Sequence, residues 1–152
     1  MIESAAARNA EAWSHSGHAD GRAVARFREL LRAWLNDTVD IGAERVCDII
    51  LATDEALANV VDHAYRDFSG AGVVTLDVSY TATEARIEIR VRDQGHWRAP
   101  EPTPISAIRG RGLILMRSLA NVCTVDGSAD GTTVSLTFHG WCQLEDSTKR
   151  FG

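Results

Sequence analysis

Three polar side chains that could take part in binding or catalysis are spaced four residues apart in the segment "DEALANVVDHAYRD", residues 54–67. The segment has a helical pattern, so Glu55, Asn59 and His63 would lie one above another on a single stripe. That stripe could simply be the solvated side of an amphipathic helix. Asn has a poor helix propensity, however, and in mid-helix it costs about half a kcal/mol relative to Ala. We therefore expect the amide of Asn59 to have a function.

A second polar cluster, "RDQGHWR" (residues 92–98), ends a strand-like run. Asp93 followed by Gly95 is also common in ordinary turns. A carboxylate at the end of a strand can nevertheless accept a hydrogen bond from an amino group, and a nearby glycine lets a ligand approach the backbone closely. This pair is therefore a candidate site for binding a ligand through its amino group.

The third cluster is "RGRGLILMRSL", residues 109–119, in which Gly110 and Gly112 precede a helical pattern. Backbone N–H groups and the positive end of the helix dipole can hold phosphate oxygens at such a place. The alternative interpretation is a flexible hinge. The G-x-x-x-x-G-K-[ST] pattern of P-loop proteins is absent from the chain.

The elements that must position these clusters follow from hydrophobic periodicity. Apolar residues at steps of three and four predict two long helices, with arginines on the outer side of the first. Alternating and β-branched runs predict strands, and a short edge strand is expected near the N-terminus. The expected helices are residues 19–35, 42–65 and 113–121, and the expected strands are 11–17, 73–80, 85–93, 122–127 and 132–140.

These elements predict a two-layer α/β sandwich. Its sheet would be mixed but mostly antiparallel, and helices would cover one face, because the strands are apolar on one side only. The length of 152 residues suits one domain. We expect an N-terminal segment at residues 1–18, the functional domain at 19–139 and a tail without periodicity at 140–152.

Composition narrows the class of protein. The chain is 45% hydrophobic and 24% charged, with a net charge of -5, which argues against a nucleic-acid surface. It has neither a signal-peptide pattern nor an apolar run long enough to cross a bilayer, so we expect a soluble, cytoplasmic protein. Three dispersed cysteines, Cys47, Cys123 and Cys142, are expected to be free thiols, with Cys47 and Cys123 buried.

The order of the clusters, followed by a "GTT" turn at residues 131–133, resembles the Bergerat ATP-binding fold of gyrase, MutL and histidine kinases. Within that histidine kinase-like ATPase fold, "DEALANVVDHAY" and "GRGLILMRSLANVCTVDGSADGTTVSLTF" look most like the anti-sigma factor serine/threonine kinases of the SpoIIAB and RsbW type. The resemblance covers roughly Ala19 to His139. Trp97 stands where the family pattern has its second glycine.

The resemblance implies roles for individual residues. Asn59 would ligate the Mg²⁺ ion that bridges the phosphates of ATP, and Glu55 would be the general base for an incoming hydroxyl. His63 would contribute less. The remaining implied nucleotide contacts are Asp93 to the adenine amine, Gly95 beside the base, Gly110 and Gly112 at the phosphates, and Thr133 to adenine through a water.

The resemblance also implies a function. The protein would be an ATP- and Mg²⁺-dependent serine/threonine kinase that phosphorylates a STAS-domain anti-sigma antagonist, sequesters a sigma factor and forms a homodimer. The alternative is a nucleotide-gated regulatory binding module with little or no kinase activity. Glu55 favours the kinase, because a pure binding module needs no base. An ATP hydrolase or a phospho-relay histidine kinase is disfavoured, because no helix pair with a phospho-acceptor histidine is evident.

Overall fold

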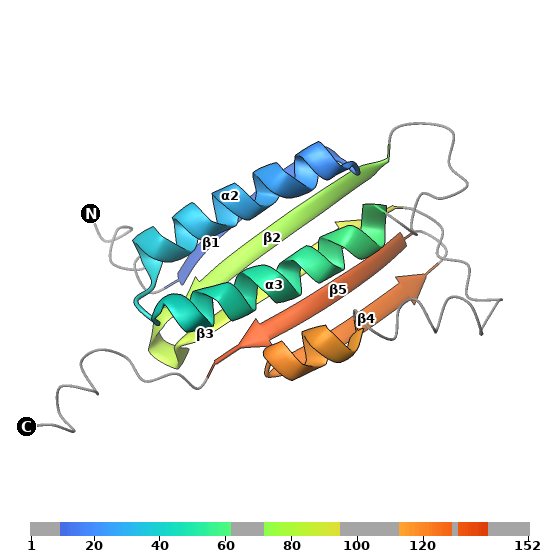
Figure 1. Cartoon of the computed structure of the whole chain (residues 1–152). Helices are drawn as coiled ribbons and strands as arrows, with labels where there is room; N and C mark the ends of the chain where they lie inside the picture. The colour runs from blue at the N-terminus through green and yellow to red at the C-terminus, as the bar shows by residue number, and fades with distance from the viewer. Residues whose placement is uncertain (1–9, 62–71, 95–112, 129–130, 140–152) are drawn as a thin grey trace, which may run out of the picture.

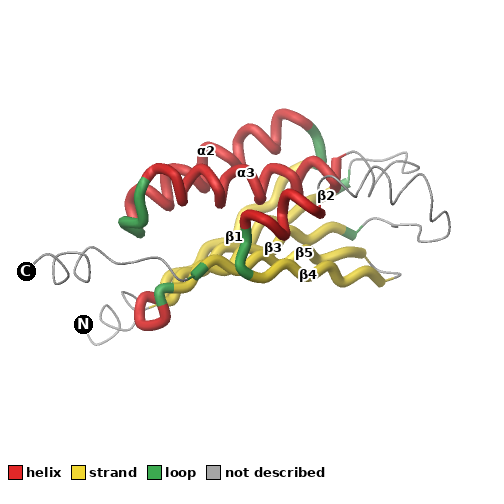
Figure 2. Tube along the Cα trace, turned by 60° about the horizontal axis from the view of Figure 1, so that its bottom comes forward, coloured by secondary structure: helices red, strands yellow, loops and turns green. Residues whose placement is uncertain are grey.

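A computed structural model describes residues 10–61, 72–94, 113–128 and 131–139 of the chain. In Figures 1 and 2 these residues form two layers, with the helices on one face of a single sheet. The five strands have the order β1-β2-β3-β5-β4, and each neighbouring pair is antiparallel. The predicted two-layer α/β sandwich is confirmed, although these five strands include none of the parallel pairs that a mixed sheet would contain.

Alternation of side chains explains which face of the sheet is covered. In β5 the buried positions alternate with half-buried ones, so that Val134, Leu136 and Phe138 face the helices. The predicted edge strand is present and longer than expected, and a short 3-10 helix, η2 (Ala82–Glu84), joins the second and third strands. The strand bounds are β1 Ala10–His18, β2 Val73–Thr81, β3 Arg86–Asp93, β4 Val122–Ser128 and β5 Gly131–Phe138.

The first helix, α2, spans Gly21–Thr38. It begins after Asp20, whose carboxylate accepts a hydrogen bond from the backbone N–H of Ala23 at 2.8 Å and so caps the helix. Its inward face buries large apolar side chains against the sheet and the second helix. These are Phe27, Leu31 and Leu35.

The second helix, α3, spans Ala43–Asn59 and contacts β3 and β5. It starts after Gly42, which has a φ of +88°, a backbone conformation that favours glycine. Ala52 and Ala56 are fully buried, and their small side chains let the helix lie close to the sheet. Residues 60–61 continue it as a π-helical turn. The predicted helix reached residue 65, and residues 62–65 lie outside the described part of the chain.

A third, short helix at residues 113–119 lies beside α3 in the helical layer and is coloured orange in Figure 1. Met116 is fully buried and Ala120 is nearly so, whereas Ile114 remains 70% exposed. The predicted short helix is therefore present. None of the helices in the described part of the chain is long and apolar enough to cross a membrane.

The expectation that Cys47 and Cys123 are buried is wrong for Cys47. It is exposed because it lies on the side of α3 away from the sheet, in spite of its apolar neighbours in the sequence. Cys123 is half-buried in β4, and burial raises the pKa of its thiol although the nearby Arg117 opposes that effect. Both are free thiols, as expected. Cys142 lies outside the described residues.

The uncovered face of the sheet is polar. Its centre holds Asp77, which accepts hydrogen bonds from Arg92 at 2.5 Å and from Ser14 at 2.6 Å. Burial alone would raise the pKa of Asp77, but these bonds and the positive charge of Arg92 outweigh it and hold the pKa below its usual range. This face therefore carries paired charges and hydroxyls, while the apolar core lies on the other side.

Candidate functional site

The predicted polar residues meet at one end of the two layers. Figure 1 shows that the C-terminal end of α3 lies over the end of the sheet at which β3 stops and β5 starts. Asn59 is the last residue of α3, Asp93 the last of β3, and Thr132 the second of β5. Three side chains that are far apart in the sequence therefore approach one end of the sheet.

Asp93 and Thr132 form the floor of this end. They are paired directly across β3 and β5, and only 6% and 2% of their surfaces are exposed. Directly opposite side chains in an antiparallel pair lie within contact range of each other. The Thr132 hydroxyl is buried and has no hydrogen-bond partner in the structure. Such a group costs about 1–3 kcal/mol when it is left unsatisfied, so a ligand or a water is expected to bind it.

Gly131 is the residue that allows β3 and β5 to approach each other here. Its φ is +145°, and a Cβ atom at this position would overlap the carbonyl oxygen of Asp93. Any side chain would therefore push the end of β3 away from the start of β5. The glycine of the "GTT" turn is thus needed for the close pairing of Asp93 with Thr132.

Thr133, to which the resemblance gave a contact with adenine through a water, is not the residue directly opposite Asp93. It is paired with Arg92, and both belong to the open face of the sheet. Successive side chains of a strand point to opposite faces of the sheet, so Thr132 and Thr133 lie on different faces although they are neighbours in the sequence. Counting in steps of two back from Phe138 and Leu136 places Thr132, rather than Thr133, on the covered face of the sheet.

The structure also corrects the environment of Asn59. The sequence placed this residue on a polar stripe, but it is only 9% exposed and lies among the buried residues of α3. Glu55, one turn earlier, is half-buried. The π-helical turn at residues 60–61 starts directly after Asn59. Turns of this kind are often found at functional sites, because they change the direction in which neighbouring side chains point.

Two polar contacts are found in α3 directly before Glu55. The guanidinium of Arg28 in α2 donates to the carboxylate of Asp54 at 2.8 Å and so ties α2 to α3. One residue earlier, the Thr53 hydroxyl is buried and donates to the carbonyl oxygen of Ile49, within the same helix, at 2.7 Å. Glu55 thus directly follows the residue through which α3 is tied to α2.

The donor set at this end fits a particular kind of cation site. The described residues contain no group of three His, Cys, Asp or Glu side chains that could hold a metal ion by themselves. Asn59 and Glu55 offer oxygen atoms, which Mg²⁺ prefers, and Mg²⁺ in proteins is commonly bound by one or two side chains together with substrate phosphates and waters. The residues present therefore fit a Mg²⁺ ion that arrives with phosphates.

A hollow of about 400 Å³ adjoins the same strand ends from the open side. Its lining includes Thr75, Arg92, Asp126 and Thr133 of the open face, and also Asp93, Gly131 and Thr132 at the strand ends. Neither Glu55 nor Asn59 contributes to it. The hollow therefore reaches the strand ends that carry Asp93 and Thr132.

Five other residues named by the sequence cannot be placed. His63, Gly95, Trp97, Gly110 and Gly112 all lie outside the described part of the chain. Their roles remain predictions of the sequence.

Comparison with known proteins agrees with this architecture. Residues 18–138 match the family described as histidine kinase-like ATPase domain. A similar solved structure is that of the RsbU and RsbW domains of Rv1364c from Mycobacterium tuberculosis, with a TM-score of 0.67 and 23% sequence identity. The similarity covers 84% of this chain and 32% of that one, so this chain spans about a third of its length. The chain belongs to the family of histidine kinase-like ATPase domains.

Proposed function

We propose that the protein binds an adenine nucleotide between α3 and the sheet, with the base at Asp93 and Thr132 and the phosphates toward Asn59. The observation that carries this proposal is the buried Thr132 hydroxyl without a partner, placed directly opposite a buried carboxylate. A carboxylate accepts from the exocyclic amine of adenine, and a hydroxyl can serve a ring nitrogen directly or through a water. Thr132 takes the role that the sequence gave to Thr133.

Asn59 is proposed as the protein ligand of a Mg²⁺ ion that accompanies the nucleotide. A neutral amide oxygen adds no negative charge to that of the phosphates, which suits a site where phosphate oxygens supply most of the ligands. When bound, the ion neutralises phosphate charge during transfer. Gly110 and Gly112 are proposed to contact the phosphates.

The activity proposed for this site is protein serine/threonine kinase. Glu55 lies one turn before Asn59 and is partly accessible, as a base for an incoming hydroxyl needs to be. The hydroxyl oxygen of the substrate would bond to the γ-phosphorus, the bond to the bridging oxygen would break, ADP would leave and Glu55 would accept the proton. The proposed substrate is a STAS-domain anti-sigma antagonist, and the proposed binding partner of the kinase is a sigma factor.

The alternative function is a nucleotide-gated binding module without useful transfer. One experiment separates the two. A STAS-domain protein from the same cell is incubated with the kinase, Mg²⁺ and ATP labelled at the γ-phosphate, and label on the STAS protein is measured. Transfer that requires Glu55 supports the kinase. Tight nucleotide binding without transfer to any STAS protein of the cell supports the binding module, and the absence of nucleotide binding contradicts both.

A further inference from the structure

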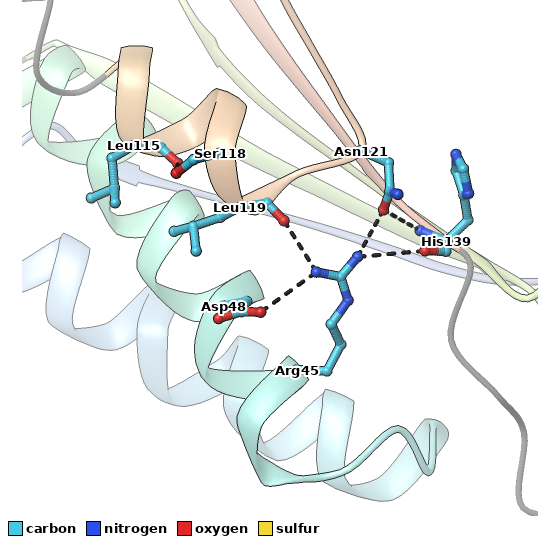
Figure 3. Close-up of polar contacts among 7 residues, drawn as sticks. All are labelled: Arg45, Asp48, Leu115, Ser118, Leu119, Asn121 and His139. Atoms are coloured by element: carbon cyan, nitrogen blue, oxygen red, sulfur yellow. Dashed lines mark hydrogen bonds and ion pairs between the residues drawn. The ribbon is translucent and has the colours of Figure 1, made fainter.

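Arg45 joins three parts of the chain through its guanidinium, as Figure 3 shows. Its guanidinium donates to the carbonyl oxygen of Leu119 (Nη1···O 3.1 Å) and to the side chain of Asn121 (Nη2···Oδ1 2.7 Å). Nη2 also lies 3.4 Å from the carbonyl oxygen of His139, and the guanidinium carbon lies 5.5 Å from the centroid of the Phe138 ring. One side chain thus links the first turn of α3 to the end of β5 and to the segment before β4.

The main acceptor of Arg45 is itself firmly held. The backbone N–H of Asn121 donates to the carbonyl oxygen of Thr137 at 2.8 Å, and its side-chain oxygen also accepts from the backbone N–H of His139 at 2.8 Å. Asp48, on the same side of α3, lies 3.5 Å from Nη1 of Arg45. Arginine can serve several such acceptors because its five N–H donors form a rigid planar fork, which lysine lacks.

The position of Arg45 is notable because α3 and β5 run in opposite directions. Arg45 is at the start of α3 and contacts the end of β5, whereas Asn59 is at the end of α3 and Thr132 is near the start of β5. Along the helix axis Arg45 and Asn59 are about 20 Å apart, at 1.5 Å per residue. The two elements are therefore tied at one end, and the candidate site lies between them at the other.

Between these ends, α3 meets the sheet through apolar side chains such as Ile49, Ala52 and Ala56. Hydrophobic contacts are non-directional, so they do not by themselves select one position of the helix along the strands. Arg45 supplies hydrogen bonds that join α3 to the segment before β4 and to the carbonyl oxygen of His139, directly after β5. Its directional bonds are thus suited to setting where α3 lies on the sheet.

We propose that Arg45 is a positioning residue for the nucleotide site: it fixes α3 on the sheet and so sets where Asn59 lies relative to Asp93 and Thr132. This inference rests on the proposed nucleotide binding. Asp93 and Thr132 are held relative to each other by the register of β3 and β5, which does not involve Arg45. Loss of Arg45 should therefore weaken the binding of Mg²⁺ and phosphates while leaving recognition of the base intact.

The test compares two ligands that differ only in their phosphates. The dissociation constant of Mg²⁺-ATP is measured by calorimetry and that of adenosine by NMR titration, under conditions where urea titration shows each variant to be folded. Arg45→Met should weaken Mg²⁺-ATP about tenfold and change adenosine binding by less than about twofold, a coupling within the usual range. If Arg45→Met does not fold, Arg45→Lys, which keeps the charge but loses the fork, carries the same comparison.

The matched control is Arg28→Met. Arg28 also makes an ion pair with α3, at 2.8 Å from Asp54, but it ties α3 to α2 rather than to the sheet. The control should leave both dissociation constants within about twofold of the unmodified protein, because its ion pair joins the two helices and does not involve the sheet.

The outcomes separate this inference from the proposed function. An unmodified protein that does not bind Mg²⁺-ATP would contradict the proposed function. If Mg²⁺-ATP binds and Arg45→Met changes both constants in the same proportion, or changes neither, Arg45 has no positioning role and the proposed function stands. Binding of Mg²⁺-ATP without detectable adenosine binding by the unmodified protein would also overturn the inference, because base recognition would then depend on more than the sheet.

Discussion

Asp93 and Thr132 face each other across β3 and β5, and the hydroxyl of Thr132 is buried with no hydrogen-bond partner. Gly131 makes this approach possible, since a side chain there would collide with the carbonyl of Asp93. A buried hydroxyl without a hydrogen-bond partner lowers stability unless a ligand or a water compensates. Binding sites commonly contain such groups, which lower the folding stability but are available to bind a ligand.

Asp93 should determine the choice of base. ATP presents an amine to the carboxylate, whereas GTP presents a carbonyl oxygen and leaves Asp93 without its donor. We expect the protein to prefer ATP over GTP by roughly 5–150-fold, which corresponds to about 1–3 kcal/mol for a lost partner. Asp93→Asn should abolish the preference, because its amide can donate to the guanine oxygen. Calorimetric titration with both nucleotides measures the preference.

The control for that experiment is Asp126→Asn, which removes an exposed carboxylate on the open face of β4. Its preference for ATP should equal that of the unmodified protein. Equal affinity of the unmodified protein for ATP and GTP would contradict the assignment of Asp93.

Thr132 and Thr133 offer a matched pair of substitutions. Thr132→Val removes the buried hydroxyl while keeping the shape, so nucleotide affinity should fall about 5–30-fold and the free energy of unfolding without ligand should stay equal or rise by up to about 1 kcal/mol. Thr133→Val, on the open face, should leave nucleotide affinity unchanged. Calorimetry and urea unfolding check the two effects. A larger loss of affinity in the Thr133 variant would restore the original assignment.

Asn59 should couple nucleotide affinity to Mg²⁺. The unmodified protein is expected to bind ATP more tightly with Mg²⁺ than with EDTA, and Asn59→Ala should remove most of that difference. Because the side chain is buried, the variant should also lose about 1–2 kcal/mol of stability. Calorimetry in both buffers provides the measurement. An Asn59→Ala protein with the full Mg²⁺ effect would show that the amide is structural.

Glu55 should act on transfer rather than on binding. Glu55→Gln keeps the shape and hydrogen-bonding capacity but cannot accept the proton, so phosphate transfer should fall by roughly 10²–10⁴-fold. ATP affinity should change little. The assay is labelled phosphate transfer to the STAS-domain substrate, together with calorimetry of ATP binding. Transfer at the full rate would mean that Glu55 is not the base and would strengthen the binding-module alternative.

We expect Asp77 to make the free energy of unfolding depend on pH. Its pKa is lowered in the folded protein, despite partial burial, by hydrogen bonds from Arg92 and Ser14. A lowered folded pKa contributes stability above the unfolded value of about 3.9, and this contribution is lost as the pH falls through the folded value. Asp77→Asn should therefore lower the free energy of unfolding at pH 7 and reduce its decline toward pH 2.

Urea unfolding at several pH values measures this effect, and Asp37→Asn, at the exposed end of α2, is the control. The control should retain the decline of the unmodified protein. A decline of equal size in the Asp77 variant would show that other carboxylates cause it.

Much of the fold could be read from local patterns. The step of three or four in the apolar residues of α3, the alternation of Ile87, Ile89 and Val91 in β3, and the glycine before helix α3 all act over a few residues, so the sequence displays them directly. The polar residues at the ends of these elements could be found in the same way, because Glu55, Asn59 and Asp93 interrupt the apolar pattern. The sequence thus determined the two layers and most of the candidate groups.

Other features depended on which distant segments meet. The pairing of Asp93 with Thr132 rather than Thr133 follows from the register between two strands about 40 residues apart, and one step of register reverses the face. The burial of Asn59 depends on how α3 lies on the sheet. In the sequence Arg45 cannot be distinguished from the other arginines on helix surfaces. Only the fold brings Leu119 and Asn121, more than 70 positions away, within hydrogen-bond distance of its guanidinium. Only the tertiary structure could decide these points, because non-local contacts are selected by the packing of the whole domain and leave no periodic mark in the local sequence.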